Sequence, residues 1–463
     1  MNSAGPDPIV LDMKRSQSQP QLERGMGPIG AVSANVLNMV GVGPFLTIPL
    51  AISAMGGPQA IVGWVLGAIL CLCDGVVWAE LGSAMPGSGG SYLYLQEAYG
   101  RHRLGLLMSF LFLWQTLLTG PLSIAAGAVG FSDYMSFIAP GLPHRALLAI
   151  AVGVCWINGA LLYRSIRSID RIAVVLAIIV LVTCCWVVLS GLLHFHAARA
   201  FNFTPDAFHI SSPSFWAGLG AASLIAVYDY GGYNNVCLLG GEIQQPRRNI
   251  PFAVVASILL VAVVYLLMNL SIIGSLDWRV AEHSKAIGAD FMQAVFGHWA
   301  ALLISILVLI ISFGGVFANM LGYSRIPYAA AAQGHFFSIF ARLHSAGKFP
   351  TASLLFMAVA SGVCCFLSLD ALIKVLIVVQ ALFQFAAQCV AVELLRRRRP
   401  QQSGTYRMPL YPVPAAVALV GWIYIALSNG LTYVLVALAC VIAGTGLYLA
   451  KARYEQEWPF ATS

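Results

Sequence analysis

The stretch YDYGGYNNV, residues 228–236, places a carboxylic acid, two adjacent glycines and two asparagines inside an otherwise apolar run. Glycine is a poor helix former, so a helix through Gly231 and Gly232 is expected to unwind. In a lipid bilayer, unwound backbone is tolerated only where it lines a cavity. An acid at this depth is a functional candidate, so Asp229 could carry a proton or pair with a cation. The alternative is a structural acid that caps freed amides.

A second run, NMVGVGPFLTIP at residues 38–49, is interrupted in the same way. Gly41 and Gly43 disfavour a helix, and Pro44 lacks the amide for an i→i−4 bond. Such glycines often serve only close helix packing. Two interrupted spans at matching places in inverted halves of a chain indicate instead the central binding site of a transporter.

Two such breaks suit one class of ligand. Free amides at a helix start attract a carboxylate, and free carbonyls at a helix end attract an ammonium group or a cation. An α-amino acid carries both groups. A site built mainly from backbone would therefore bind the part that all amino acids share and leave nearby side chains to select the rest.

The elements that must position these breaks are membrane-spanning helices. Of the 463 residues, 59% are hydrophobic and 9% are charged, with a mean hydropathy of +0.82, whereas a soluble domain carries about 25% charged residues. The alternating ten-residue segments of a barrel are absent, so we predict an all-α integral membrane protein. Apolar runs of sufficient length predict about twelve transmembrane helices, near residues 28–54, 58–82, 104–132, 146–163, 170–193, 214–240, 251–275, 299–323, 351–368, 371–395, 410–429 and 431–450.

The basic residues set the expected orientation. If the N-terminus is cytoplasmic, Lys and Arg on that side outnumber those opposite by roughly five to one, as the positive-inside rule requires. We predict a multi-pass protein of the cytoplasmic membrane with both termini in the cytoplasm. Residues 1–26 are expected to form a disordered cytoplasmic N-terminus without a signal peptide, and residues 453–463 a cytoplasmic tail. The net charge of +7 then reflects topology, and no nucleic-acid partner is expected.

Other chemistries have little support in the sequence. The ten cysteines all fall in predicted spans, where thiols pack well. His194, His196 and His209 lack a carboxylate or cysteine partner for a metal. PGSGGSY at residues 86–92 lacks the Gly-Lys-Ser/Thr ending of a phosphate-binding loop. Without a nucleophile–base or metal constellation, we expect no enzyme, no metal site and no cofactor.

Several separate stretches resemble the amino acid–polyamine–organocation (APC) superfamily, in particular its L-type amino acid and polyamine-uptake branches. They are GVGPF at 41–45, AELGSAMPGSGGSYLYLQEAYG at 79–100, GEIQQPRRNIP at 241–251, LGYSRIPYAAAAQG at 321–334 and RRRRPQQSGTYRMPLYPVP at 396–414. The resemblance implies the leucine-transporter fold, in which five plus five helices form inverted repeats, helices 1 and 6 are broken, and helices 11 and 12 follow. The transporter domain would cover residues 27–452, with repeats at 27–193 and 214–396 and helices 11–12 at 410–450.

The same resemblance implies that a substrate's carboxylate meets the first break and its amino group the second. The candidate substrate-binding residues are Val42, Gly43, Pro44, Phe45, Tyr228, Asp229, Tyr230, Gly231, Tyr233 and Phe313. Tyr228 or Tyr233 would shield the substrate, and Phe313 could equally be a packing residue. Asp229 and Asp74 are the coupling candidates, although Asp74 could equally be a buried acid tied to neighbouring helices. Further cavity-lining candidates, each of which could instead make an interhelical hydrogen bond, are Asn38, Gln115, Asn234 and Asn319.

Two departures from the family bear on coupling. Several proton-coupled relatives carry a lysine in helix five, but the fifth span here has none, and the matching place is near Leu176 or Ala177. Sodium-coupled relatives place hydroxyls in helix eight, but residues 313–320 offer none, although Ser312 is adjacent. Sodium coupling is therefore not expected, and proton coupling would fall to Asp229.

The resulting hypothesis is a secondary active transporter that moves amino acids or polyamines across the cytoplasmic membrane by alternating access. It would be a symporter or an exchanger, independent of sodium, with H+ as a candidate coupling ion and the lipid bilayer as its surroundings. Asp229 with Asp74 fits a cationic amino acid or a polyamine, and a neutral amino acid with Asp229 as proton carrier fits as well. The rival class is an amine-binding, transport-like receptor or a channel without coupled flux. The substrate, the direction and the oligomeric state are left open.

Overall fold

The structure is a computed structural model that describes residues 22–101, 103–398, 404–456 and 458–460. It is nearly all-helical, as predicted, and the described residues form three isolated bridges but no β-strand. Residues 1–21 of the expected disordered N-terminus lie outside the described residues. Met26, in contrast, is fully buried and bridges to Ile243.

The helices follow one another along the chain with short connections. The first half contains α2 (Pro28–Met39), α3 (Pro44–Met55), η1 (Pro58–Ala60), α4 (Ile61–Ala84), α5 (Ser91–Ala98), α6 (Leu104–Ile138), α7 (His144–Leu161) and α8 (Ile166–Leu193). The second half contains α9 (Ala197–Ala200), α10 (Pro213–Tyr230), α11 (Asn235–Leu238), α12 (Pro246–Ser275), α13 (Trp278–Ala281), α14 (Ile287–Phe296), α15 (His298–Tyr323), α16 (Arg325–Ala332), η2 (Ser338–Ala341), α17 (Thr351–Cys364), α18 (Leu369–Val379), the π-helical η3 (Gln380–Phe385) and α19 (Ala386–Arg398). The chain ends with α20 (Val413–Ser428) and α21 (Leu431–Glu455).

Each predicted span coincides with a helix or with a broken helix. Within the described ranges, eight helices are long and apolar enough to cross a membrane, and the bent pair α2–α3 raises the number to nine. The remaining predicted spans correspond to the shorter apolar helices α17 and α20 and to the pair α10–α11. The membrane-spanning, all-α prediction is therefore confirmed, whereas the count of twelve and the inverted repeat stay predictions.

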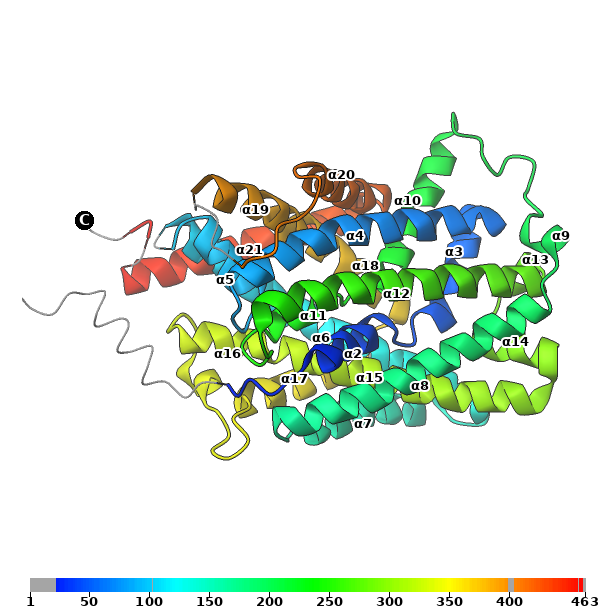
Figure 1. Cartoon of the computed structure of the whole chain (residues 1–463), viewed down its shortest axis with the longest axis horizontal. Helices are drawn as coiled ribbons and strands as arrows, with labels where there is room; N and C mark the ends of the chain where they lie inside the picture. The colour runs from blue at the N-terminus through cyan, green and yellow to red at the C-terminus, as the bar shows by residue number, and fades with distance from the viewer. Residues whose placement is uncertain (1–21, 102, 399–403, 457, 461–463) are drawn as a thin grey trace, which may run out of the picture.

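Most long helices run roughly along the long axis of the molecule (Figure 1). The C-terminal end of α21 lies toward the same end as α5 and α16, and we call this the terminal end. α3, α13 and α14 lie at the opposite, far end. The short helices α5, α14 and α16 lie between predicted spans and were not expected from the sequence.

Small residues bring α4 and α10 into close contact. A Cβ atom placed on Gly63 would lie 2.7 Å from the Cβ of Ala222, and one on Gly67 would lie 2.9 Å from that of Ala226. Glycine and alanine four residues apart on both helices allow this approach, as is typical of membrane helix pairs. The packing holds the end of α10 firmly against α4.

Two buried ion pairs stabilise the terminal end. The guanidinium of Arg325 binds Glu242 through two bonds of 2.9 Å, and both side chains are 2% exposed. Arg396 binds Glu80 through two bonds of 2.6 Å. Paired, two-bond contacts of this kind are the strong form of the arginine–carboxylate interaction. They join α16 to the α11–α12 connection, and α19 to α4.

Candidate functional site

The first break separates α2 from α3, whose axes are bent by 49°. Residues 40–43 are non-helical. Among the described residues, none accepts a hydrogen bond from the amides of Gly41, Val42 or Gly43. These amides lie at the start of α3, where the helix dipole favours negative charge. The first break is therefore suited to an anion.

The second break separates α10 from α11 and depends on Gly232. This residue has φ +110°, a conformation that favours glycine. A Cβ atom here would also lie 2.7 Å from Cγ of Asn38 in α2. The glycine thus allows both the unwinding and the close approach of the two breaks.

The end of α10 leaves carbonyl groups without their helical partners. The amide of Gly231 donates to the carbonyl of Tyr228 at 3.2 Å, rather than to that of Val227 as a continued α-helix would require. The carbonyl of Gly231 accepts no hydrogen bond from any described residue. Free carbonyls at the end of a half-helix favour a positively charged group.

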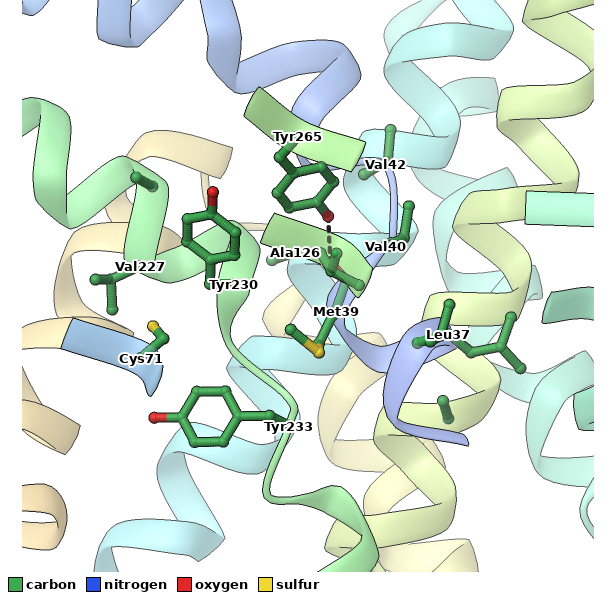
Figure 2. Packing of buried hydrophobic residues seen from close by; sticks show 14 of the residues in the cluster. Leu37, Met39, Val40, Val42, Cys71, Ala126, Val227, Tyr230, Tyr233 and Tyr265 are labelled. Carbon is green, nitrogen blue, oxygen red and sulfur yellow. Dashed lines mark hydrogen bonds between the residues drawn. The ribbon is translucent and has the colours of Figure 1, made fainter. Parts of the chain in front are cut away.

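Two side chains that sequence reasoning missed hold the breaks together. Asn35 of α2 donates to the carbonyl of Tyr233 at 2.6 Å and accepts from the amide of Val236 at 2.9 Å. The hydroxyl of Tyr265 in α12 donates to the carbonyl of Met39 at 2.7 Å (Figure 2). Figure 2 also shows the two unwound segments beside each other, with Tyr230 and Tyr233 directed away from the first break.

The carboxylate of Asp229 lies between the two breaks and is 2% exposed. Its Oδ2 accepts a hydrogen bond from the hydroxyl of Thr47, whereas Oδ1 has no partner among the described residues. A Cβ atom on Gly43 would lie 2.0 Å from this Oδ1, so the acid contacts the first break directly. Among the described residues the carboxylate accepts from a hydroxyl and from no backbone amide, so these contacts give no support to the capping alternative. Oδ1 is a buried acceptor without a partner in this part of the chain.

These groups border one cavity of about 900 Å³, a volume that includes space open to solvent. The breaks form one side of it, and α6, α15, α18, η3 and α20 supply the rest. Nine of the residues singled out from the sequence line it: Asn38, Val42, Gly43, Tyr228, Asp229, Gly231, Tyr233, Asn234 and Asn319.

Four other substrate-binding candidates lie outside the cavity lining. Pro44 begins α3 and is buried. Phe45 is fully buried at the far end, where its ring lies against Gly288 of α14. Tyr230 packs edge-on against Trp64, with ring centroids 6.0 Å apart. Phe313 is half-buried against the hydrophobic core, in line with the packing alternative.

Gln115 is also absent from the lining, although it was expected there. Its Nε2 donates to Oε1 of Gln384 at 2.9 Å, which joins α6 to η3. Asn319, in contrast, lines the cavity and accepts a hydrogen bond of 2.9 Å from Ser123. The amides therefore divide between an interhelical bond and the cavity wall, and helical position alone did not distinguish the two.

Several lining residues were not singled out from the sequence. They are polar or aromatic side chains from helices that carry no break, among them Ser123, Tyr323, Gln380, Phe385 and Trp422. Gln380 donates to the hydroxyl of Tyr323 at 3.2 Å. Gln380 and Phe385 begin and end the π-helical turn η3, and such turns are frequent at functional sites. In the sequence, a polar residue within an apolar run was the one feature that could have indicated these lining positions.

The coupling candidate Asp74 is fully buried in α4 and does not line the cavity. Its Oδ2 accepts a hydrogen bond of 2.5 Å from the hydroxyl of Tyr233. Its Oδ1 accepts one of 3.1 Å from the indole of Trp422, and the thiol of Cys389 lies 4.0 Å away. Both oxygens are therefore engaged.

Comparison with known proteins adds independent findings. A family model described as amino acid permease matches residues 29–454. Asc-type amino acid transporter 1 of Mus musculus is 28% identical over 363 residues, which are 74% of this chain and 64% of the mouse protein. The serine/threonine exchanger SteT of Bacillus subtilis is 26% identical over 427 residues, 89% of this chain and 92% of that protein.

A further relative is large neutral amino acids transporter small subunit 2 of Homo sapiens, which is 26% identical over 350 residues, 73% of this chain and 64% of the human protein. The match thus spans slightly less than two thirds of the length of the mouse and human relatives, but nearly all of the bacterial one.

Proposed function

The chain belongs to the amino acid permease family, and from this premise we propose that it exchanges neutral amino acids across a membrane by alternating access. The resemblance to the APC superfamily is thereby confirmed. The three relatives described above are named as amino acid transporters or exchangers, which supports a small-molecule amino acid substrate and gives no support to a polyamine.

The observation that carries the proposal is the meeting of the two breaks at one cavity. Free amides at Gly41, Val42 and Gly43 would bind the substrate carboxylate. The carbonyl of Gly231 and the open oxygen of Asp229 would bind the ammonium group. Because Oδ1 of Asp229 lies close against Gly43, both charges of one amino acid fall within reach.

The remaining lining favours an uncharged substrate side chain. Asp229 is the one residue with a charged side chain among those that line the cavity within the described part of the chain. A polyamine or a cationic amino acid would need a second acid for its second ammonium. Asp74 does not line the cavity, and its oxygens accept hydrogen bonds from Tyr233 and Trp422, so the neutral option is the better supported of the two.

The position of the cavity fits one state of an alternating-access cycle. At the far end, α3 packs against α10 and α14, and Tyr134 donates to the carbonyl of Phe45 at 2.9 Å. From the breaks the cavity extends to Leu238 and Tyr323, near the terminal ends of α11 and α15. With both termini in the cytoplasm, this arrangement is inward-facing.

The finer parts of the hypothesis follow from the same site. We place the protein in the cytoplasmic membrane as a multi-pass protein with both termini cytoplasmic. Sodium independence is supported by residues 313–320 of α15, which carry no side-chain hydroxyl. Asp229 would be the proton acceptor if transport is coupled to H+.

Flux in proteoliposomes tests the proposal. Purified protein would be reconstituted, and uptake of serine, alanine, leucine, arginine and putrescine measured with and without the same compound inside. We expect saturable uptake of the neutral amino acids, accelerated by internal substrate and unchanged when sodium is replaced by choline. Flux of putrescine or arginine alone would contradict the neutral assignment. Binding without flux would indicate a receptor, and unsaturable flux a channel.

A further inference from the structure

Asp74 joins three separate elements although it contacts no cavity space itself. Its carboxylate oxygens accept from Tyr233 in the second break and from Trp422 in α20, and Cys389 of α19 is nearby. Burying a carboxylate costs free energy unless its oxygens accept hydrogen bonds. The two strong donors are therefore held in fixed orientations by one side chain of α4.

Both donors form part of the cavity wall. Tyr233 and Trp422 line it, and so does Phe385, whose ring stacks on the indole of Trp422 with centroids 4.2 Å apart and planes 19° apart. These three aromatic side chains make one wall, which we call the aromatic wall. Its orientation depends on Asp74 at two of its three members.

The helix that supplies Phe385 is irregular at this place. Residues Gln380–Phe385 form a π-helical turn, which shifts the side chains by one position relative to an α-helix. The turn packs against α20 and places both of its end residues in the cavity lining. The aromatic wall is thus built from an unwound segment, a π-helical turn and the α-helix α20.

We propose that Asp74 is a positioning residue that holds Tyr233 and Trp422 in place and thereby limits the size of the amino acid side chain that the cavity accepts. The proposal rests on the proposed function of neutral amino acid exchange. Asp74 does not contact the substrate and does not take part in the binding of its charged groups. Its effect is on selection among neutral amino acids.

The experiment measures a preference rather than a rate. Exchange of labelled serine in proteoliposomes would be competed with unlabelled serine, leucine and phenylalanine, which gives a ratio of inhibition constants for each protein. The variants are Asp74→Asn, which can no longer accept at both oxygens, and Trp422→Phe, which keeps a ring but loses the indole N–H. Trp114→Phe is the matched control, because its indole donates to the carbonyl of Cys440 at 3.0 Å, away from Asp74.

We expect Asp74→Asn and Trp422→Phe each to lower the inhibition constant of phenylalanine relative to that of serine by at least about fivefold. Each variant loses a hydrogen bond to residue 74, and such a bond contributes about 1 kcal/mol. The double variant should show no larger shift than the stronger single variant, because both changes break the same contact. Trp114→Phe should leave the ratio unchanged.

Two results would overturn the inference. One is an unchanged ratio in both variants together with an equal loss of uptake for all substrates, as a purely structural acid would give. The other is the same shift in Trp114→Phe. If Asp74→Asn does not fold, Trp422→Phe decides the question. Absence of saturable exchange in the wild-type protein would refute the proposed function, whereas wild-type exchange with an unchanged ratio would refute the role of Asp74 alone.

Discussion

Asp229 and Asp74 are both buried acids of an apolar chain, 2% and 0% exposed, yet their surroundings differ. Asp229 lies in the last turn of α10, just before the second break; one of its oxygens accepts a hydrogen bond from Thr47, and the other has no partner among the described residues. Asp74 lies within a continuous helix, and donors from neighbouring elements occupy both of its oxygens. A buried acid in a membrane segment is therefore available to a ligand only where the surrounding residues do not supply hydrogen-bond donors to both of its oxygens.

The largest effect on serine exchange should come from Asp229, and the comparison with Asp74 tests the difference between the two acids. Asp229→Asn removes the charge beside the substrate ammonium, and a hydrogen bond to a charged group contributes about 1.5–3 kcal/mol, so kcat/KM for serine should fall by about 10- to 100-fold. Asp74→Asn should change serine exchange by no more than about threefold, because it does not contact the substrate. Initial exchange rates across serine concentrations measure both. Equal losses in the two variants would remove the distinction between the acids.

A second test moves the carboxylate of Asp229 without altering it. Gly43→Ala places a methyl group 2.0 Å from Oδ1 of Asp229. Because Gly43 has φ −39° and ψ −71°, a conformation that alanine also adopts, the effect is steric. We expect a fall in serine kcat/KM of about 30-fold, equivalent to about 2 kcal/mol of overpacking.

Gly153→Ala in α7 is the matched control for this test, since a methyl group there meets nothing within 4 Å and Gly153 does not line the cavity. Serine exchange by this variant should stay within about twofold of the wild type. A comparable loss at both positions would show that contact with Asp229 is not the cause.

A smaller effect is expected at the bound oxygen of Asp229. Thr47→Val keeps the shape of the side chain but removes the hydroxyl that donates to Oδ2. The freed carboxylate should rotate, and serine KM should rise about fivefold, the equivalent of a hydrogen bond of about 1 kcal/mol. The same KM measurement on Thr47→Ser, which restores the donor, should return close to the wild-type value. If the KM of the Thr47→Ser variant does not return toward the wild-type value, the loss in Thr47→Val is due to packing rather than to the hydrogen bond.

The smallest effect should come from the backbone side of the site. Tyr265→Phe removes the hydroxyl that donates to the carbonyl of Met39 at 2.7 Å. Such a bond contributes about 0.5–1.5 kcal/mol to the free energy of unfolding. A denaturant titration of the detergent-solubilised protein should show a loss in this range, with serine KM altered less than in Thr47→Val. If Tyr265→Phe raises serine KM more than Thr47→Val does, the position of the backbone at Met39, rather than that of Asp229, dominates binding.

The breaks were predictable because their causes are local. Adjacent glycines and a glycine–proline pair cannot continue a helix in a chain this apolar, and the structure interrupts α2–α3 and α10–α11 there. Asp229 was chosen as a candidate for the same reason, because it lies two residues before the adjacent glycines. The short helices α5, α14 and α16 were missed because they are too short or too polar to give a span signal.

The far wall of the cavity depends on tertiary contacts that a sequence does not show. Trp422 is one of ten tryptophans in the sequence. It donates to Asp74, which lies more than 300 residues earlier in the chain, and no neighbouring residue in the sequence indicates this contact. Gln115 and Asn319 are both amides in apolar helices, but one pairs with another amide and the other faces the cavity. Rotation of each helix about its axis decides between these outcomes, and it is set by packing.

The hydrogen bonds of Asn35 to Tyr233 and Val236 restrict the motion of α2 relative to the segment that leads into α11. α2 and the segment leading into α11 are joined across about 200 residues of chain, the separation being 198 for the first contact. In the proposed alternating-access cycle, α2 and α11 should therefore move together as one rigid unit. Spin labels on α2 and α11 should keep a constant separation through the cycle, while labels on α2 and α3 should not.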